Sequence, residues 1–178
     1  MTRGIWLVLL AAVVSAQDQS SEPEKLAPYY PTPETIVQKM LQLGELRSGE
    51  KMFDLGSGDG RIVIMAAEKF HANAVGIELE KDLYKQSTEK IAALKLQKTA
   101  RFINGDIMQQ DYSSADLITM YLLPNSNDKV RPLLEKQLKK GTRVVSHDFE
   151  IRDWKPEKVE TIDDDGEGRS HTLYLYRR

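Results

Sequence analysis

Apolar and polar residues alternate with two different periods along the chain, and each change of period marks a predicted helix or strand. A first helix is expected after Pro33, its first helical residue, with Thr32 as its N-cap. Its apolar stripe consists of Ile36, Val37, Met40 and Leu41. After this helix, short apolar runs predict strands over residues 51–55, 74–78, 99–103, 115–121 and 142–146.

Amphipathic stretches separate these strands and predict helices up to residue 70, over residues 81–96 and over residues 128–139. Regular alternation of strand and helix predicts an α/β fold with a doubly wound, mostly parallel sheet. The rhythm changes near the end. Residues 158–162 and 171–176 are separated by a short glycine-containing stretch in which no helix fits, so we expect a hairpin and an antiparallel last strand.

The turn after the first strand carries three alternating glycines in Asp54-Leu55-Gly56-Ser57-Gly58-Asp59-Gly60-Arg61. A dinucleotide fingerprint needs its third glycine at position 61, which Arg61 occupies. Acids at Asp54 and Asp59 flank the turn, and carboxylates disfavour a pyrophosphate at a helix N-terminus. The turn therefore favours a ligand with a positive centre and no phosphate, such as S-adenosylmethionine. The alternative is a tight turn with no ligand.

Two further strands end on acids. Glu78 closes the second strand, where a carboxylate can accept hydrogen bonds from both ribose hydroxyls; alternatively it is a solvated residue at a helix start. Asp106 follows the third strand and could accept from an adenine amino group, with Ile107 packed on the ring. The alternative is a simple Asn-Gly-Asp turn.

These motifs resemble those of class I S-adenosylmethionine-dependent methyltransferases. A closer resemblance covers residues 29–156 and includes Tyr30-Pro31-Thr32-Pro33, Tyr121-Leu122-Leu123-Pro124, Ser146-His147-Asp148-Phe149 and Trp154. It is to the small lysine methyltransferases that modify the ATP synthase c subunit and the adenine nucleotide translocase, with their prokaryotic relatives. The resemblance implies a seven-stranded sheet and methyl transfer to a protein lysine. The expected cofactor-binding residues are Tyr30, Thr32, Asp54, Gly56, Ser57, Gly58, Asp59, Gly60, Glu78, Asp106 and Ile107.

Catalysis is expected where the fourth and fifth strands end. Tyr121 could contact the sulfonium region or guide a lysine amine, unless it is only a packed tyrosine. Asp148 could orient an ammonium group or take its proton, and His147 could do so nearer neutral pH. Both can also be read as ordinary loop polarity. The segment Tyr121-Leu122-Leu123-Pro124 lacks the leading carboxamide and the final aromatic residue of base-methylating enzymes.

Composition narrows the classes of partner. The 178 residues include 25 basic and 27 acidic ones, a formal net charge of −2, so no basic excess indicates nucleic-acid binding. The hydrophobic fraction of 40% is enough for one sizeable core. Cysteine is absent, and the histidines at 71, 147 and 171 have no ligand spacing, so no metal is expected. We expect a protein substrate, with a membrane protein as one candidate.

The amino-terminal residues 1–16 combine Arg3, a ten-residue apolar run and small residues before a potential cleavage site after Ala16. They predict a signal peptide and export; the alternative is membrane attachment, which avoids the difficulty that S-adenosylmethionine is made inside cells. Residues 17–27 are expected to form a flexible tether before a methyltransferase domain over residues 28–178. A small-molecule methyltransferase and a non-catalytic S-adenosylmethionine-binding module remain alternatives to the protein-lysine enzyme.

Overall fold

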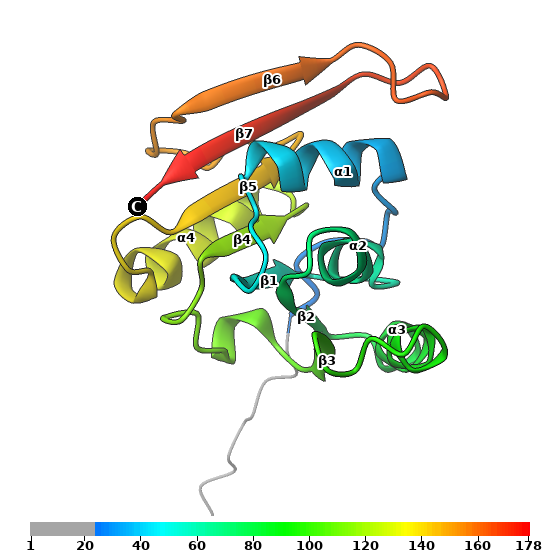
Figure 1. Cartoon of the computed structure of the whole chain (residues 1–178). Helices are drawn as coiled ribbons and strands as arrows, with labels where there is room; N and C mark the ends of the chain where they lie inside the picture. The colour runs from blue at the N-terminus through cyan, green and yellow to red at the C-terminus, as the bar shows by residue number, and fades with distance from the viewer. Residues whose placement is uncertain (1–23) are drawn as a thin grey trace, which may run out of the picture.

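A computed structural model describes residues 24–178, so the expected targeting segment, residues 1–16, lies outside the described residues. Seven strands form one open sheet in the order β3-β2-β1-β4-β5-β7-β6 (Figure 1). The parallel strands are β1 (Lys51–Leu55), β2 (Asn73–Glu78), β3 (Ala100–Asn104), β4 (Leu117–Met120) and β5 (Arg143–His147). The predicted doubly wound, mostly parallel sheet is confirmed.

The last two strands form the expected antiparallel hairpin. β6 (Lys158–Ile162) pairs with β7 (His171–Arg177), and β7 inserts between β6 and β5, antiparallel to both. Because β7 runs against the parallel strands, its first residue, His171, lies at the edge of the sheet where β5 ends. The hairpin therefore adds side chains to the carboxyl edge of the parallel strands, where ligands bind in open α/β sheets.

Helices cover both faces of the sheet. α1 (Glu34–Leu43), α2 (Arg61–Lys69) and α3 (Lys81–Ala93) lie on one face, and α4 (Pro124–Gln137) lies on the other (Figure 1). Alternate strand residues point to opposite faces, so two apolar cores form. Met40, Val63 and Leu117 belong to the core under the first three helices. Phe53, Ile118 and Leu134 belong to the core under α4.

Two helix starts differ from the prediction. α1 begins at Glu34, and its N-cap residue is Pro33, whose carbonyl accepts from the Val37 N–H at 2.9 Å. Thr32 is therefore not the N-cap. α4 begins at Pro124, four residues before the predicted start, because proline has no N–H to satisfy and its φ suits the first helical turn.

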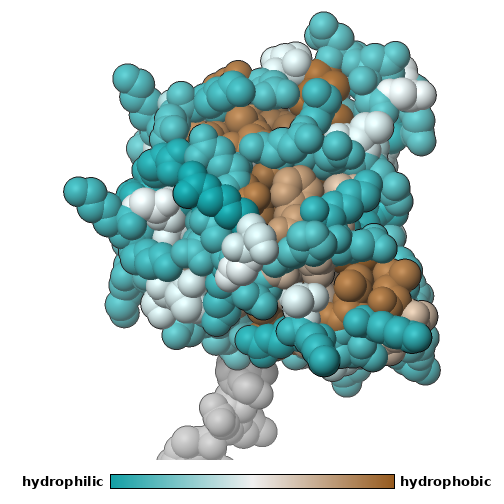
Figure 2. Space-filling view, in the orientation of Figure 1, coloured by the Kyte–Doolittle hydropathy of each residue, from teal (hydrophilic) through white to brown (hydrophobic). Residues whose placement is uncertain are grey.

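Hydrophilic residues cover most of the face drawn in Figure 2, and hydrophobic residues show in separate patches. Between residues 24 and 178, no helix combines the length and the apolar character needed to cross a bilayer. A short 3-10 helix, η1 (Ile107–Gln109), follows β3 and was not predicted. Its N-cap is Asp106, whose carboxylate accepts from the Met108 N–H at 2.8 Å.

Candidate functional site

The glycine-rich loop between β1 and α2 is held in a conformation that other residues adopt only with strain. Gly56, Gly58 and Gly60 have φ angles of 75°, 54° and 84°. The loop is anchored to β2, because the N–H groups of Gly56 and Ser57 both donate to the Ile77 carbonyl, at 3.0 and 2.9 Å. This turn leaves the end of β1 open toward the carboxyl edge of the sheet.

Asp54 is a buried carboxylate with one oxygen in use. Its Oδ1 accepts from Thr119 Oγ1 at 2.8 Å, while Oδ2 has no hydrogen-bond partner within residues 24–178. Burial raises the pKa of Asp54 to about 7, and the neighbouring carboxylates of Glu78 and Asp59 act in the same direction. The buried hydroxyl of Ser57 also lacks a partner in the described part of the chain. Buried polar atoms without a partner are free to form hydrogen bonds with a ligand.

Glu78 closes β2 and supports the loop from the other side. Its Oε2 accepts from the Gly58 N–H at 2.7 Å, and its Oε1 accepts from the Glu80 N–H at 2.8 Å. Each oxygen keeps a second lone pair for a ligand hydroxyl. Glu78, Gly56, Asp106 and Ile107 line one cavity, so four of the predicted cofactor-binding residues are brought together.

This cavity contains about 520 Å³ of space, part of it open to solvent. Acidic groups lie at its edge in Glu78 and Asp106. Apolar side chains of Leu83, Ile107 and Leu122 complete the lining. A nucleoside fits this combination, because its ribose needs acceptors and its flat base needs apolar surfaces. The residues present therefore fit S-adenosylmethionine.

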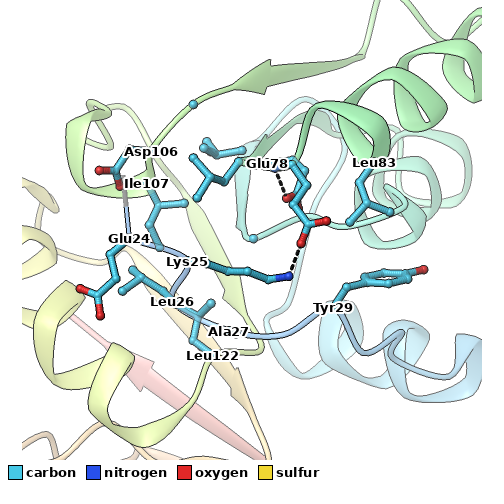
Figure 3. Close-up of a pocket in the computed structure, with 15 residues that line it drawn as sticks. Glu24, Lys25, Leu26, Ala27, Tyr29, Glu78, Leu83, Asp106, Ile107 and Leu122 are labelled. Atoms are coloured by element: carbon cyan, nitrogen blue, oxygen red, sulfur yellow. Dashed lines mark hydrogen bonds and ion pairs between the residues drawn. The ribbon is translucent and has the colours of Figure 1, made fainter. Parts of the chain in front are cut away.

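Residues 24–29 form a segment across the cavity, here named the strap (Figure 3). Lys25 points into the cavity, and its ammonium pairs with the Glu80 carboxylate. The Ser126 hydroxyl donates to the Leu26 carbonyl, and Leu26 and Ala27 pack against the core under α4. Part of the expected tether is thus one wall of the cavity.

Tyr29 belongs to the strap and was missed. Its ring lies so close to Gly58 that an added Cβ there would come within 2.8 Å of it. The sequence carried one signal for it, the tyrosine pair preceding Pro31, but the prediction selected Tyr30. Tyr30 is instead 54% exposed and bonded through its hydroxyl to Arg169, outside the cavity lining.

Thr32 and Asp59 also lie outside the cavity lining, as do Asp54 and the loop residues Ser57, Gly58 and Gly60. The Asp59 carboxylate pairs with Arg61 at 2.9 Å and with Lys90 at 3.1 Å. Although its partial burial acts in the opposite direction, these cations hold the pKa of Asp59 below its usual range. Thr32 is buried, and its Oγ1 lies 3.3 Å from His147 Nδ1.

Tyr121 and Asp148 meet after β4 and β5. The Tyr121 hydroxyl donates to Asp148 Oδ2 at 3.1 Å. The Tyr121 ring also lies against the His147 ring, with centroids 3.9 Å apart, and stacks with the ring of Phe149 at 6.3 Å. Leu122, the next residue in the chain, lines the cofactor cavity, whereas the four side chains of this group are not part of the lining. The three predicted catalytic residues therefore lie together.

The β6–β7 hairpin adds two residues that the sequence prediction missed, His171 on β7 and Asp165 in the loop before it. His171 places Nδ1 at 2.9 Å from His147 Nε2 and at 3.1 Å from Asp148 Oδ2. Its Nε2 lies 3.3 Å from Asp165 Oδ2. The expectation that the histidines lack ligand spacing is therefore wrong for His147 and His171, which the insertion of β7 brings together. His71 is exposed and lies elsewhere.

The pKa values indicate which of these groups carries a charge near neutral pH. Burial raises the pKa of Tyr121 to about 12, helped by the Asp148 charge. Burial also lowers the pKa of His147 to about 4, despite the opposite effect of Asp148. Although burial opposes it, the Thr172 N–H bond and the neighbouring histidines and tyrosine keep the pKa of Asp148 below its usual range. Near neutral pH, Asp148 is thus charged, and Tyr121 and His147 are neutral.

Comparisons with known proteins agree with this geometry. A family model described as the ANTKMT methyltransferase domain matches residues 54–158. A protein-lysine N-methyltransferase of Saccharolobus islandicus is 42% identical over 150 residues, covering 84% of this chain and 92% of that protein. The lysine N-methyltransferase of the ATP synthase c subunit from Xenopus laevis is 29% identical over 153 residues, covering 86% of this chain and 67% of that protein.

One solved structure is similar in both fold and sequence. It is an RNA methyltransferase from Salinibacter ruber in complex with S-adenosyl-L-homocysteine, with a TM-score of 0.76 and 41% identity. The match covers 83% of this chain and 93% of that one. The relatives therefore share methyl transfer, while their descriptions name two kinds of acceptor.

Proposed function

Because the chain belongs to the ANTKMT methyltransferase domain family and is an S-adenosylmethionine-dependent methyltransferase, we propose that its acceptor is the side-chain amine of a protein lysine. The observation that carries this proposal is the contact between Tyr121 and Asp148, which follow the carboxyl ends of the neighbouring strands β4 and β5. A charged carboxylate and an aromatic wall suit an incoming ammonium group. The names of two relatives also support a lysine acceptor.

S-adenosylmethionine supplies a methyl group already activated on a sulfonium. In our assignment, Glu78 would accept hydrogen bonds from the ribose hydroxyls, and Asp106 with Ile107 would hold the adenine. The free Oδ2 of Asp54 lies at the end of β1, where it suits the cofactor's positively charged amino acid part. Tyr30 and Thr32 remain the predicted contacts of the methionine carboxylate, although both hydroxyls already contact the protein.

The lysine must lose a proton before it can attack, since its usual pKa is about 10.4. Asp148 has the right charge to draw the ammonium toward the site, and its side chain is 24% exposed. The Tyr121 hydroxyl fixes the orientation of that carboxylate, and the Tyr121 ring can form one wall for the alkyl chain. His147 is fully buried, so we assign it to positioning Tyr121 rather than to taking the proton.

An RNA acceptor is the second candidate, because the similar Salinibacter ruber protein is described as an RNA methyltransferase. The net charge of −2 argues against it, since RNA binding relies on basic surface. A small-molecule acceptor and a non-catalytic cofactor-binding module are the third and fourth candidates. The first three candidates each predict a different methylated product, and the fourth predicts no methyl transfer.

The test follows tritiated methyl groups into an extract of the cells that make this protein. Label should enter protein, and acid hydrolysis should release it as methyllysine. Nuclease treatment of the extract beforehand should leave the labelling unchanged, while protease treatment should abolish it. Label found only in RNA or only in small molecules would contradict the lysine proposal, and no label in any fraction would favour the binding module.

We further propose, from residues 1–16, that the protein is exported or held at a membrane and that its substrate is a membrane protein. Because S-adenosylmethionine is made inside cells, its supply favours the membrane-held form. Fractionation of cells, followed by mass spectrometry of the amino-terminal peptide, tests this. A full-length peptide in the cytosolic fraction would contradict both forms.

A further inference from the structure

Three potential ligand atoms converge where β5 meets β7: His147 Nε2, His171 Nδ1 and Asp148 Oδ2, here named the His-Asp-His cluster. The two nitrogens are 2.9 Å apart, and Asp148 Oδ2 lies 3.1 Å from the His171 nitrogen and 3.4 Å from the His147 nitrogen. Among residues 24–178 these atoms form the group of possible metal ligands within 4.8 Å of one another.

A hydrogen bond between the two nitrogens uses one proton, because one nitrogen donates and the other accepts across 2.9 Å. The separation of 3.4 Å between His147 Nε2 and Asp148 Oδ2 joins two atoms that each carry lone pairs. A cation at the centre of the cluster can accept an electron pair from each of the three atoms, so their convergence suits a metal ion.

We propose that the His-Asp-His cluster is a binding site for Zn²⁺. Ligand distances of about 2.0–2.2 Å place neighbouring ligand atoms roughly 3.0 to 3.5 Å apart, depending on whether the angles are octahedral or tetrahedral. The observed separations of 2.9, 3.1 and 3.4 Å lie close to that range. Two imidazoles and one carboxylate suit Zn²⁺, whereas Mg²⁺ and Ca²⁺ prefer oxygen ligands throughout.

The outer ring nitrogens have the supports that metal-binding histidines need. Asp165 Oδ2 lies 3.3 Å from His171 Nε2, which fixes the tautomer that leaves Nδ1 free for the metal. Thr32 Oγ1 lies 3.3 Å from His147 Nδ1 and can accept a hydrogen bond from an Nδ1–H group, which leaves Nε2 for the metal. Asp148 Oδ1 is held by the Thr172 N–H at 2.9 Å. The three ligands are therefore oriented before any ion arrives.

Access and position also fit. Both imidazoles are almost fully buried, but the Asp148 side chain is 24% exposed and gives an ion a way in from solvent. Three protein ligands leave a fourth position open to water. The second lone pair of Asp148 Oδ2 stays available to the Tyr121 hydroxyl. Because a bound divalent cation offsets the negative charge of Asp148, the metal-free form is the one that draws the acceptor ammonium. The bound ion would tie β5, β7 and the loop with Asp165 together.

The test measures metal binding by the full chain without cofactor or acceptor. Chelator-treated protein is titrated with Zn²⁺, and Co²⁺ is added separately as a spectroscopic probe. We expect one Zn²⁺ per chain with a Kd below about 1 μM, intense visible Co²⁺ bands and a raised melting temperature. Mg²⁺ should produce no shift. Lack of stoichiometric Zn²⁺ binding would overturn the proposal.

Matched variants localise the ion. His171→Gln should weaken Zn²⁺ binding at least about 100-fold, while His71→Gln, which changes an exposed histidine, should bind like the unchanged chain. Asp165→Asn keeps all three ligand atoms and should weaken binding about 10- to 100-fold, because the His171 ring loses the carboxylate that orients it. Equal binding by all variants would overturn the proposal. Methyl transfer by metal-free protein would leave the proposed function standing, because the two tests share no readout.

Discussion

The hydroxyl of Tyr121 lies 3.1 Å from Oδ2 of Asp148, so side chains that follow two neighbouring strands act as one group. Neither residue lies inside its strand, and each is more exposed than the strand residues before it. The contact joins a neutral phenol to a carboxylate that stays charged. Removing this contact should slow transfer to the acceptor while leaving cofactor binding intact.

Tyr121→Phe removes the hydroxyl and keeps the ring. We expect kcat for methyl transfer to fall about 10- to 100-fold, because the carboxylate loses its orienting donor. Affinity for S-adenosylmethionine should stay within about twofold, as measured by calorimetric titration. Tyr84→Phe, on α3, is the matched control and should change neither quantity. Unchanged kcat in Tyr121→Phe would refute the catalytic role of this hydroxyl.

The raised pKa of Asp54 predicts pH-dependent cofactor binding. The cationic cofactor favours the ionised carboxylate, and burial raises the pKa of this group to about 7 in the free protein. S-adenosylmethionine affinity should therefore rise about tenfold between pH 6 and pH 8, with proton release on binding. Calorimetry in buffers of different ionisation enthalpy measures both. Asp54→Asn should bind more weakly and lose the dependence.

The same shift affects the free energy of unfolding. The folded pKa of Asp54 lies above the value of 3.8 for a free carboxyl, so the folded state holds the proton more tightly. This contribution to stability is full below pH 3.8 and is lost as the pH rises toward about 7. Urea titrations of cofactor-free protein, with Asp54→Asn as the reference, should show this slope. A flat difference between the two would contradict the burial argument.

Substitutions at two glycines distinguish the cost of backbone strain from the cost of a steric clash. Gly60 and Gly168 have almost the same φ, 84° and 83°, but an added Cβ meets Phe102 at 2.5 Å only at Gly60. Gly168→Ala should lose about 1–2 kcal/mol of unfolding free energy from the left-handed backbone. Gly60→Ala should lose about 1–3 kcal/mol more from overpacking. Equal losses in urea denaturation would mean that Phe102 moves aside freely.

The strap should contribute to cofactor affinity through Leu26. Leu26→Asp places a carboxylate where an apolar side chain packs against the core under α4, and should detach this wall of the cavity. We expect S-adenosylmethionine to bind about tenfold more weakly and to dissociate faster in stopped-flow experiments. Leu94→Asp, at a side chain that is 47% exposed, is the control. Equal affinity in both variants would mean that the strap does not contribute to cofactor binding.

Local patterns were enough to predict the parallel part of the fold. The turn from Asp54 to Gly60 carries its own geometry in three glycines, and Glu78 and Asp106 follow strands that the apolar runs reveal directly. Such features depend on neighbouring residues in the chain, and parallel strands with helices between them bring their carboxyl ends to one edge. The cofactor half of the site was therefore within reach of sequence reasoning.

The acceptor half depends on pairings that no local pattern specifies. His171 reaches His147 only because β7 inserts between β5 and β6, and the hairpin alone was compatible with either strand next to β5. Asp59 was assigned to the cofactor from its place in the glycine turn, yet Lys90 lies 31 residues away and engages it. Leu26 and Ala27 were assigned to the tether because the sequence does not reveal what an isolated apolar pair packs against.

The strap makes the amino-terminal side of this domain one wall of the cofactor cavity. Anything that pulls on the chain upstream of Glu24, such as a fusion partner or a surface that holds residues 1–23, acts on a wall of the cavity. Arg178, by contrast, bonds to Gly141 and Thr142 at the opposite edge of the sheet, where β5 begins. We expect an affinity handle at the carboxyl terminus to leave the rate of cofactor exchange unchanged. A handle at the amino terminus should slow turnover.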